Sequence, residues 1–280
     1  MRRNTTVTAV SAAALAAVLG WGAGPGHASE AQEPLRYVAM GDSAAAGPLI
    51  PDQVDRDCLR SDRNYPSVAA AELGAELTDV SCSGATLEDF SGGSSPQYEA
   101  LDESTDLVTV TIGGNDTELV ALTLGCVNLL PPPLGRSCAD EMTAGGTDRV
   151  AEAIRAWEPA FGEALAEIRR RAPHARILVA GYGTYLRDGG CWPAQPIWSR
   201  DADYVQGSVD ALNDALRRQA EAHGAGYVDL AAVSVGHDTC APAGERYLEG
   251  LVAVSPAAPL HPNARGMAAF GAEVARAARG

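Results

Sequence analysis

Residues 107–116 read LVTVTIGGND, an apolar and β-branched run that ends in glycine and polar residues. An unbroken run of this kind is typical of a strand that is buried on both faces, as strands of parallel sheets are. Ligand and catalytic sites of such sheets form beyond the carboxyl ends of the strands. This stretch therefore predicts a central strand with Asn115 and Asp116 at the edge where a site would form.

Similar short apolar runs alternate with helical patterns along the rest of the chain. Strands are expected at residues 35–40, 76–80, 176–181 and 226–230, and helices at 66–73, 150–168, 205–216 and 263–280. This alternation is typical of βαβ units with helices on both faces of a mostly parallel sheet. The sequence predicts a three-layer α/β/α fold, with residues 29–280 forming a single domain.

The first 28 residues have the pattern of a secretory signal peptide. Arg2 and Arg3 precede an apolar run at residues 7–19, and the small residues around His27 provide a cleavage site after Ala28. A membrane anchor is the alternative, but the run is shorter than the ~20 apolar residues that span a bilayer. We expect a secreted protein with no integral membrane segment after cleavage.

The chain is acidic, with a formal net charge of −15. Removal of Arg2 and Arg3 with the leader would make it more acidic still. Nucleic-acid binding needs a basic footprint, and docking on anionic membranes needs basic residues as well. We therefore expect neither partner, and we expect the mature chain to be a monomer with a well-solvated surface.

Six cysteines follow the leader, an even number that predicts disulfide bonds in a secreted protein. Pairing in sequential order is the simplest expectation, and it joins Cys58–Cys82, Cys126–Cys138 and Cys191–Cys240. A zinc site is the competing interpretation. No two cysteines have C-x-x-C spacing and no histidine pair lies beside them, which argues against zinc.

Three expected strands end in residues that suit nucleophilic catalysis. Ser43 follows the first strand in GDS, Gly84 follows the second in SCSGAT, and Asn115 follows the third. A serine nucleophile needs a base and oxyanion donors. His261, in PLHPNARG before the last expected helix, is the natural base. Ser83 is a rival nucleophile, but neither serine lies in the G-x-S-x-G elbow of ordinary α/β-hydrolases.

These four blocks, in this order, resemble the GDSL-type or SGNH family of serine esterases and lipases, and in particular its secreted actinobacterial members. The resemblance implies a flavodoxin-like sheet and a hydrolase of carboxylic esters. It assigns Ser43 and His261 to catalysis, and it assigns the Ser43 and Gly84 N–H groups and the Asn115 amide to the oxyanion hole. It implies neither a metal nor a cofactor, although a peripheral calcium site stays open.

One position departs from the family pattern. Where the family usually has an aspartate, three residues before the histidine, this chain has Ala258. The hypothesis is a Ser–His dyad in which a backbone carbonyl of residues 257–259 accepts the Nδ1 proton. Asp238 and Glu249 are the acids that could replace this carbonyl. A secreted binding protein without turnover is the alternative that the missing acid supports.

Lipids are the favoured substrates of the expected esterase, by resemblance alone. Phospholipase action and deacylation of polysaccharides or aryl esters are alternatives at the same site. Trp192 and Trp198 either line an acyl groove or pack beneath a disulfide-clamped loop. Metal-dependent hydrolysis is disfavoured because the chain has no H-E-x-x-H motif.

Overall fold

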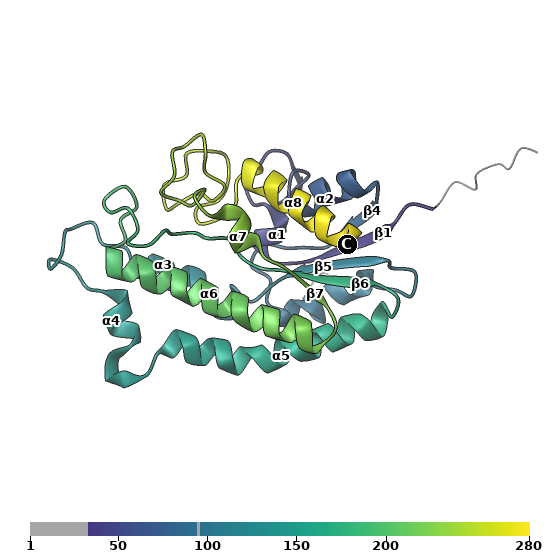
Figure 1. Ribbon diagram of the computed structural model, residues 1–280, viewed down its shortest axis with the longest axis horizontal. Helices are drawn as coiled ribbons and strands as arrows, with labels where there is room; N and C mark the ends of the chain where they lie inside the picture. Colours follow the sequence, from purple (N-terminus) through teal and green to yellow (C-terminus); the bar gives the residue numbers. More distant parts are fainter. Residues whose placement is uncertain (1–32, 94–95) are drawn as a thin grey trace, which may run out of the picture. The chain divides into compact units, whose positions relative to one another are not determined.

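A parallel β-sheet forms the centre of the molecule (Figure 1). The computed structural model describes residues 33–93 and 96–280, so the expected leader at residues 1–28 lies outside the described part. Within that part the sheet has five strands in the order β4-β1-β5-β6-β7. Their bounds are Glu76–Asp79 for β4, Arg36–Gly41 for β1, Leu107–Thr111 for β5, Arg176–Ala180 for β6 and Gly226–Val228 for β7.

The register of the sheet brings three strand ends together. β1 pairs in parallel with β4 on one side, and with β5 on the other, where Gly41 lies opposite Thr111. In the chain order of the sheet strands this is the 2-1-3-4-5 order of a flavodoxin-like sheet, as the resemblance implied. The segments after β1, β4 and β5 therefore emerge at neighbouring positions of one sheet edge.

Helices cover both faces of the sheet because the strand residues alternate between two apolar cores. Val38 and Met40 face a core that contains residues of α5, Arg149–Arg171, and α6, Ser199–Ala222. Tyr37 and Ala39 face the other core, with α2, Tyr65–Leu73, and α8, Ala264–Arg279. All five residues of β5 are buried. The expected three-layer α/β/α architecture is confirmed.

Several short elements that were not expected connect these layers. They are the antiparallel hairpin of β2, Gln53–Asp55, and β3, Arg60–Ser61, and four helices: α1, Ser43–Ala46, α3, Leu119–Gly125, α4, Cys138–Met142, and α7, Leu230–Ser234. They are too short for periodicity to reveal. Two of them, α1 and α3, carry residues of the candidate site.

Candidate active site

Ser43 is the first residue of α1, directly beyond the end of β1. The turn that places it there requires Gly41, whose φ is +140° and where a Cβ atom would lie 2.3 Å from the Thr111 carbonyl oxygen. Asp42 caps the helix, because its carboxylate accepts a hydrogen bond of 2.8 Å from the Ala44 N–H. The Ser43 hydroxyl is thus held, only partly buried, at the sheet edge.

His261 lies on the loop before α8, and its imidazole reaches Ser43. The distance from His261 Nε2 to Ser43 Oγ is 2.6 Å, and His261 Nδ1 lies 2.7 Å from the carbonyl oxygen of Pro259. Because a carbonyl oxygen can only accept, Nδ1 must carry the proton in the neutral ring. Nε2 is then free to accept the proton of the Ser43 hydroxyl, which is the tautomer that a general base needs.

No carboxylate of the described residues takes the place of the missing acid. Asp238 pairs with Arg187 and accepts from the Cys240 N–H. Glu249 accepts from the Asn263 side chain and from the Val254 N–H. The Pro259 carbonyl, within the stretch expected to supply the acceptor, is the group that contacts Nδ1. Burial lowers the pKa of His261, and the hydrogen bond to Pro259 opposes that shift.

Asn115 follows β5 and lies beside Ser43 and His261 in the wall of one pocket. Its side-chain Nδ2 donates a hydrogen bond of 2.9 Å to the Ala85 carbonyl oxygen, which fixes the orientation of the amide. An amide nitrogen carries two hydrogens, so a second N–H remains for a bound group. The amide can therefore donate to an anion without itself titrating.

Gly84 lies on the loop after β4 and lines a different hollow, of about 530 Å³, not the pocket that contains Ser43. Its φ of +88° is in the left-handed region, where glycine is favoured. Within residues 33–93 and 96–280, the backbone N–H groups of Gly84 and Ser43 have no protein acceptor. Both are thus available to a ligand.

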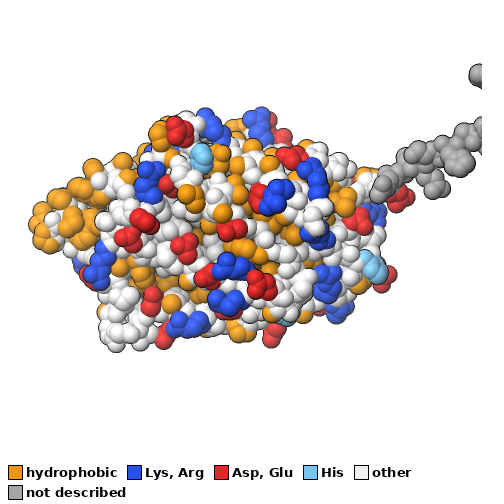
Figure 2. Space-filling model, in the orientation of Figure 1, with side chains coloured by type: hydrophobic (Ala, Val, Ile, Leu, Met, Phe, Trp, Pro, Cys, Tyr) orange, Lys and Arg blue, Asp and Glu red, His pale blue; other side chains and the backbone are white. Residues whose placement is uncertain are grey.

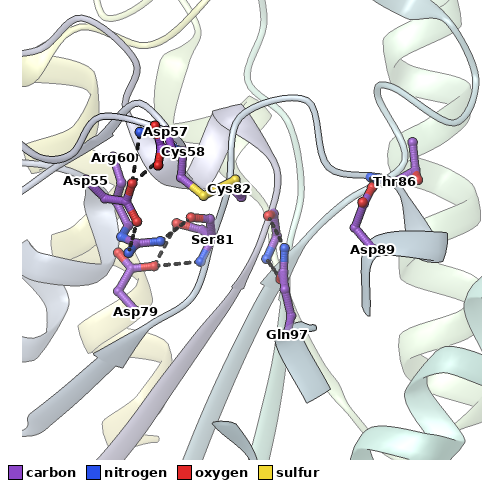
Figure 3. Close-up of a disulfide and its surroundings, with 11 residues drawn as sticks. Asp55, Asp57, Cys58, Arg60, Asp79, Ser81, Cys82, Thr86, Asp89 and Gln97 are labelled. Carbon is purple, nitrogen blue, oxygen red and sulfur yellow. Dashed lines mark hydrogen bonds and ion pairs between the residues drawn. A yellow bond between two sulfur atoms is a disulfide. The ribbon is translucent and has the colours of Figure 1, made fainter. Parts of the chain in front are cut away.

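The Gly84 loop is anchored by the first of three disulfides, Cys58–Cys82 (Figure 3). Arg60 of the hairpin pairs with Asp55 and donates a hydrogen bond of 2.6 Å to the Ser81 carbonyl oxygen. Asp79 in turn accepts from the Ser81 N–H and hydroxyl. The other two bonds join Cys126 to Cys138 and Cys191 to Cys240, so the structure pairs all six cysteines in sequential order.

Tyr182 belongs to the site although the sequence analysis did not single it out. Its hydroxyl donates to the Asp42 carboxylate and accepts a hydrogen bond of 2.8 Å from the Gly114 N–H, next to Asn115. Burial raises the pKa of Asp42 to about 7, although the hydrogen bonds from Tyr182 and Ala44 lower it. Tyr182 lies just beyond β6, so the rule about strand ends could have identified it.

The pocket beside Ser43 is mostly apolar and has a volume of about 680 Å³, open to solvent. Its walls come from α3, α6 and the loops after β6 and before α8, with Leu119, Val120, Ile197, Val205, Val209 and Leu260 among the lining residues. Trp192 and Trp198 do not line it. They donate to the carbonyl oxygens of Asn128 and Leu130, so they pack beneath the loop as the second alternative expected.

Among residues 33–93 and 96–280, no three His, Cys, Asp or Glu side chains gather in a way that could hold a metal ion. Within the same part of the chain, every helix is too short or too polar to cross a membrane. The groups that the site itself offers are a hydroxyl, an imidazole and amide donors.

Known proteins are similar to this chain in sequence and in fold. Lipase 2 of Streptomyces coelicolor is 42% identical over 280 residues, covering 95% of this chain and 93% of that protein. Two crystal structures are also similar. Phospholipase A1 from Streptomyces albidoflavus NA297 has a TM-score of 0.71 at 26% identity, covering 88% of this chain and 100% of its own. The extracellular lipase from Streptomyces rimosus has a TM-score of 0.72 at 25% identity, covering 87% and 98%.

The range that matches a family model includes the candidate site residues from Ser43 to His261. Residues 39–269 match the GDSL-like Lipase/Acylhydrolase family, a range that includes Ser43 and His261. Together with the curated lipases that match most of its length, this shows that the chain is a carboxylic ester hydrolase and belongs to the GDSL-like lipase/acylhydrolase family.

Proposed function

We propose that the protein is a secreted lipase or esterase that cleaves fatty acyl esters with Ser43 as nucleophile and His261 as base. The observation that carries this proposal is the 2.6 Å contact between Ser43 Oγ and His261 Nε2, with Nδ1 held by the Pro259 carbonyl. A nucleophile, a base and a group that orients the base are the parts that acyl transfer by a serine requires.

The reaction proceeds in two halves. Ser43 Oγ attacks the ester carbonyl carbon while its proton passes to His261 Nε2, and the imidazolium then gives this proton to the leaving alcohol. Water next attacks the acyl-serine ester and gives a proton to Nε2. Collapse of the second tetrahedral intermediate releases the acid, and His261 returns the proton to Ser43 Oγ.

The negative charge of each tetrahedral intermediate falls on the former carbonyl oxygen. The N–H groups of Ser43 and Gly84 lack protein acceptors, and the Asn115 amide has one N–H left. We assign the oxyanion hole to these three donors. Donors held in place before the reaction cost no reorganisation when the charge develops.

The pocket favours long acyl chains over acetyl groups because its walls are apolar side chains of α3 and α6. The curated relative from S. coelicolor is a lipase, and one similar solved structure is a phospholipase A1. Export of the chain is supported by the leader pattern, by the three disulfides and by the extracellular lipase of S. rimosus.

Hydrolysis of p-nitrophenyl esters with acyl chains of two to about sixteen carbons tests the proposal. We expect turnover that increases with chain length, and loss of turnover in Ser43→Ala. The matched control is Ser83→Ala, which removes the rival hydroxyl and should leave turnover unchanged. Full activity in Ser43→Ala would assign the nucleophile elsewhere. Inactivity of the unmodified protein would favour the binding-protein alternative.

A further inference from the structure

A loop between α3 and α4 exposes apolar side chains to solvent. We call residues 124–134, which are the last two residues of α3 and the segment that follows, the apolar loop. Its exposed residues include Leu129, which is 79% exposed, Leu134, which is 65% exposed, and Leu124, Val127 and Leu130. Figure 2 shows orange side chains gathered at the left of the view, where Figure 1 places this teal loop. An apolar cluster of this kind on a soluble protein marks an interaction surface.

The chemistry of this segment contrasts with that of the whole chain. Residues 119–135 contain no Asp, Glu, Lys or Arg, although 20% of the chain is charged and its net charge is −15. Pro131, Pro132 and Pro133 are exposed together with the leucines. The segment therefore offers apolar contact, and electrostatic attraction contributes nothing to it.

The backbone of the apolar loop is held in place by a disulfide and by hydrogen bonds. The Cys126–Cys138 disulfide closes it, and Asn128 ties it together by donating a hydrogen bond of 2.8 Å to the Arg136 carbonyl oxygen. The indole N–H of Trp198 donates to the Leu130 carbonyl oxygen at 2.8 Å. A rigid platform that displays apolar groups loses little conformational entropy when it binds.

The apolar loop begins at the end of α3, the helix that forms part of the wall of the pocket beside Ser43. Leu119, Val120 and Thr123 of α3 line that pocket, and Leu124, the next residue, is already exposed at the start of the loop. Val120 both lines the pocket and is 38% exposed. Helix α3 thus contributes side chains to the pocket beside Ser43 and leads directly into the apolar loop.

We propose that the apolar loop inserts its leucines into the surface of a lipid aggregate and so brings the pocket to water-insoluble esters. The inference rests on the proposed function, because a lipid surface is where such esters are found. A protein partner fits less well, since stable protein interfaces use about 20 residues a side and this patch is a single loop. The acidic chain implies that neutral lipid suffices and that anionic lipid does not strengthen binding.

Flotation with neutral phosphatidylcholine vesicles tests the proposal, in a Ser43→Ala background that prevents hydrolysis. We expect the parent to float with the vesicles at low and high salt. The double variant Leu129→Asp/Leu134→Asp should bind more than about tenfold more weakly, because two apolar contacts are replaced by charges. The matched control is Val54→Asp, which charges a side chain that is 65% exposed in the β2–β3 hairpin and should bind as the parent does.

Two activity assays separate this proposal from the proposed function. With Ser43 restored, the double variant should hydrolyse a soluble p-nitrophenyl butyrate like the unmodified protein, but lose activity on a lipid emulsion. Equal vesicle binding by parent and double variant, or no binding by the parent, would overturn the lipid proposal even if the soluble ester is cleaved. Failure to cleave the soluble ester would refute the catalytic proposal. The flotation result would still be interpretable, because that assay uses Ser43→Ala and needs no turnover.

A second copy of the chain is the other occupant to test. Light scattering over a range of protein concentrations, without lipid, should show one species for the parent and for the double variant. A dimer that the Leu129→Asp/Leu134→Asp changes dissociate would assign the apolar loop to that interface and overturn the lipid proposal. Unchanged thermal melting of the variants confirms that these exposed substitutions leave the fold intact.

Discussion

His261 donates its Nδ1 proton to the Pro259 carbonyl, an acceptor that carries no full charge. Such an acceptor fixes the tautomer and the direction of the ring, as a carboxylate does, but it stabilises the imidazolium less. Burial acts in the same sense, because it disfavours the charged ring. The proposed base is therefore well oriented and weakly basic.

The acid limb of the pH profile should reflect this environment. Burial lowers the pKa of His261, so the neutral ring persists to a lower pH than in a free imidazole. We expect kcat/KM for a soluble ester to fall only below the ordinary histidine pKa of about 6.5. In Ala258→Asp a carboxylate would favour the imidazolium and move this limb to higher pH. An apparent pKa above about 6.5 for the acid limb of the unmodified protein would contradict the proposed Ser–His dyad.

Asn115→Ala tests the proposed oxyanion hole. Loss of one such donor typically lowers the rate about 100- to 1000-fold. We expect a loss of this size in kcat with KM little changed, because the contact forms only as charge develops. The substitution also removes the hydrogen bond to Ala85, so thermal melting of the variant is the control. A KM effect alone would place Asn115 in substrate binding.

Asp42 should make stability depend on pH. Burial raises its pKa to about 7, so the folded chain holds a proton that the unfolded chain has already released above pH 4. Stability from this group is present at low pH and is lost as pH rises through about 7. The full shift corresponds to at most about 4 kcal/mol.

The comparison with Asp42→Asn isolates this contribution, since the amide stays neutral at every pH. The free energy of unfolding of the unmodified protein, relative to the variant, should fall between about pH 4 and pH 7 in urea titrations and stay level at higher pH. A difference that does not change with pH would show that Asp42 is ionised throughout. The indole and tyrosine fluorescence of both proteins gives the unfolding midpoints.

At the level of elements, the strands and long helices were predictable because each carries a period or an unbroken apolar run. The strand-end rule likewise led to Ser43, Gly84 and Asn115. Helices α1 and α3 were not predictable, because their four and seven residues give too few repeats of the helical period to detect. The pairing of β1 between β4 and β5 depends on contacts between distant residues, which no local pattern contains.

The loop that carries Gly84 depends on a covalent anchor between elements. Cys58–Cys82 ties this loop to the turn between β2 and β3, with a sequence separation of 24. We expect Cys58→Ser/Cys82→Ser to lower stability by about 3 kcal/mol. Its kcat on a soluble ester should also fall, by less than the loss of a whole donor. The control Cys126→Ser/Cys138→Ser should lose stability but keep kcat, and equal kcat in both would remove Gly84 from the oxyanion hole.

For the whole molecule, the sequence indicated the function through the spaced motifs that contain the four candidate site residues. It did not indicate the pocket or the apolar loop. The pocket is assembled by α3, α6 and loops far apart in the chain. In the sequence, the apolar loop is a proline-rich stretch around Cys126, with no periodicity that would indicate its exposure. Its position depends on hydrogen bonds from Trp192 and Trp198, which are distant in the chain and which no local pattern predicts.

The three disulfides together should account for much of the stability of the folded chain. Each closes a loop of 12 to 49 residues and contributes about 3 to 4 kcal/mol in the chain-entropy model. Domains are typically stable by only 5 to 15 kcal/mol. Since about 1 kcal/mol corresponds to about 2–4 °C in a domain of this size, reduction should lower Tm by more than about 10 °C.

Thermal melting followed by circular dichroism, with and without a phosphine reductant, measures this shift. Mass spectrometry of the alkylated protein confirms how many bonds were reduced. The fall should be graded, smallest when only the most accessible bond is open and largest when all three are. An unchanged Tm after full reduction would mean that the two apolar cores hold the sheet and its helices without the bridges, and that the bridges serve only to position the Gly84 loop and the apolar loop.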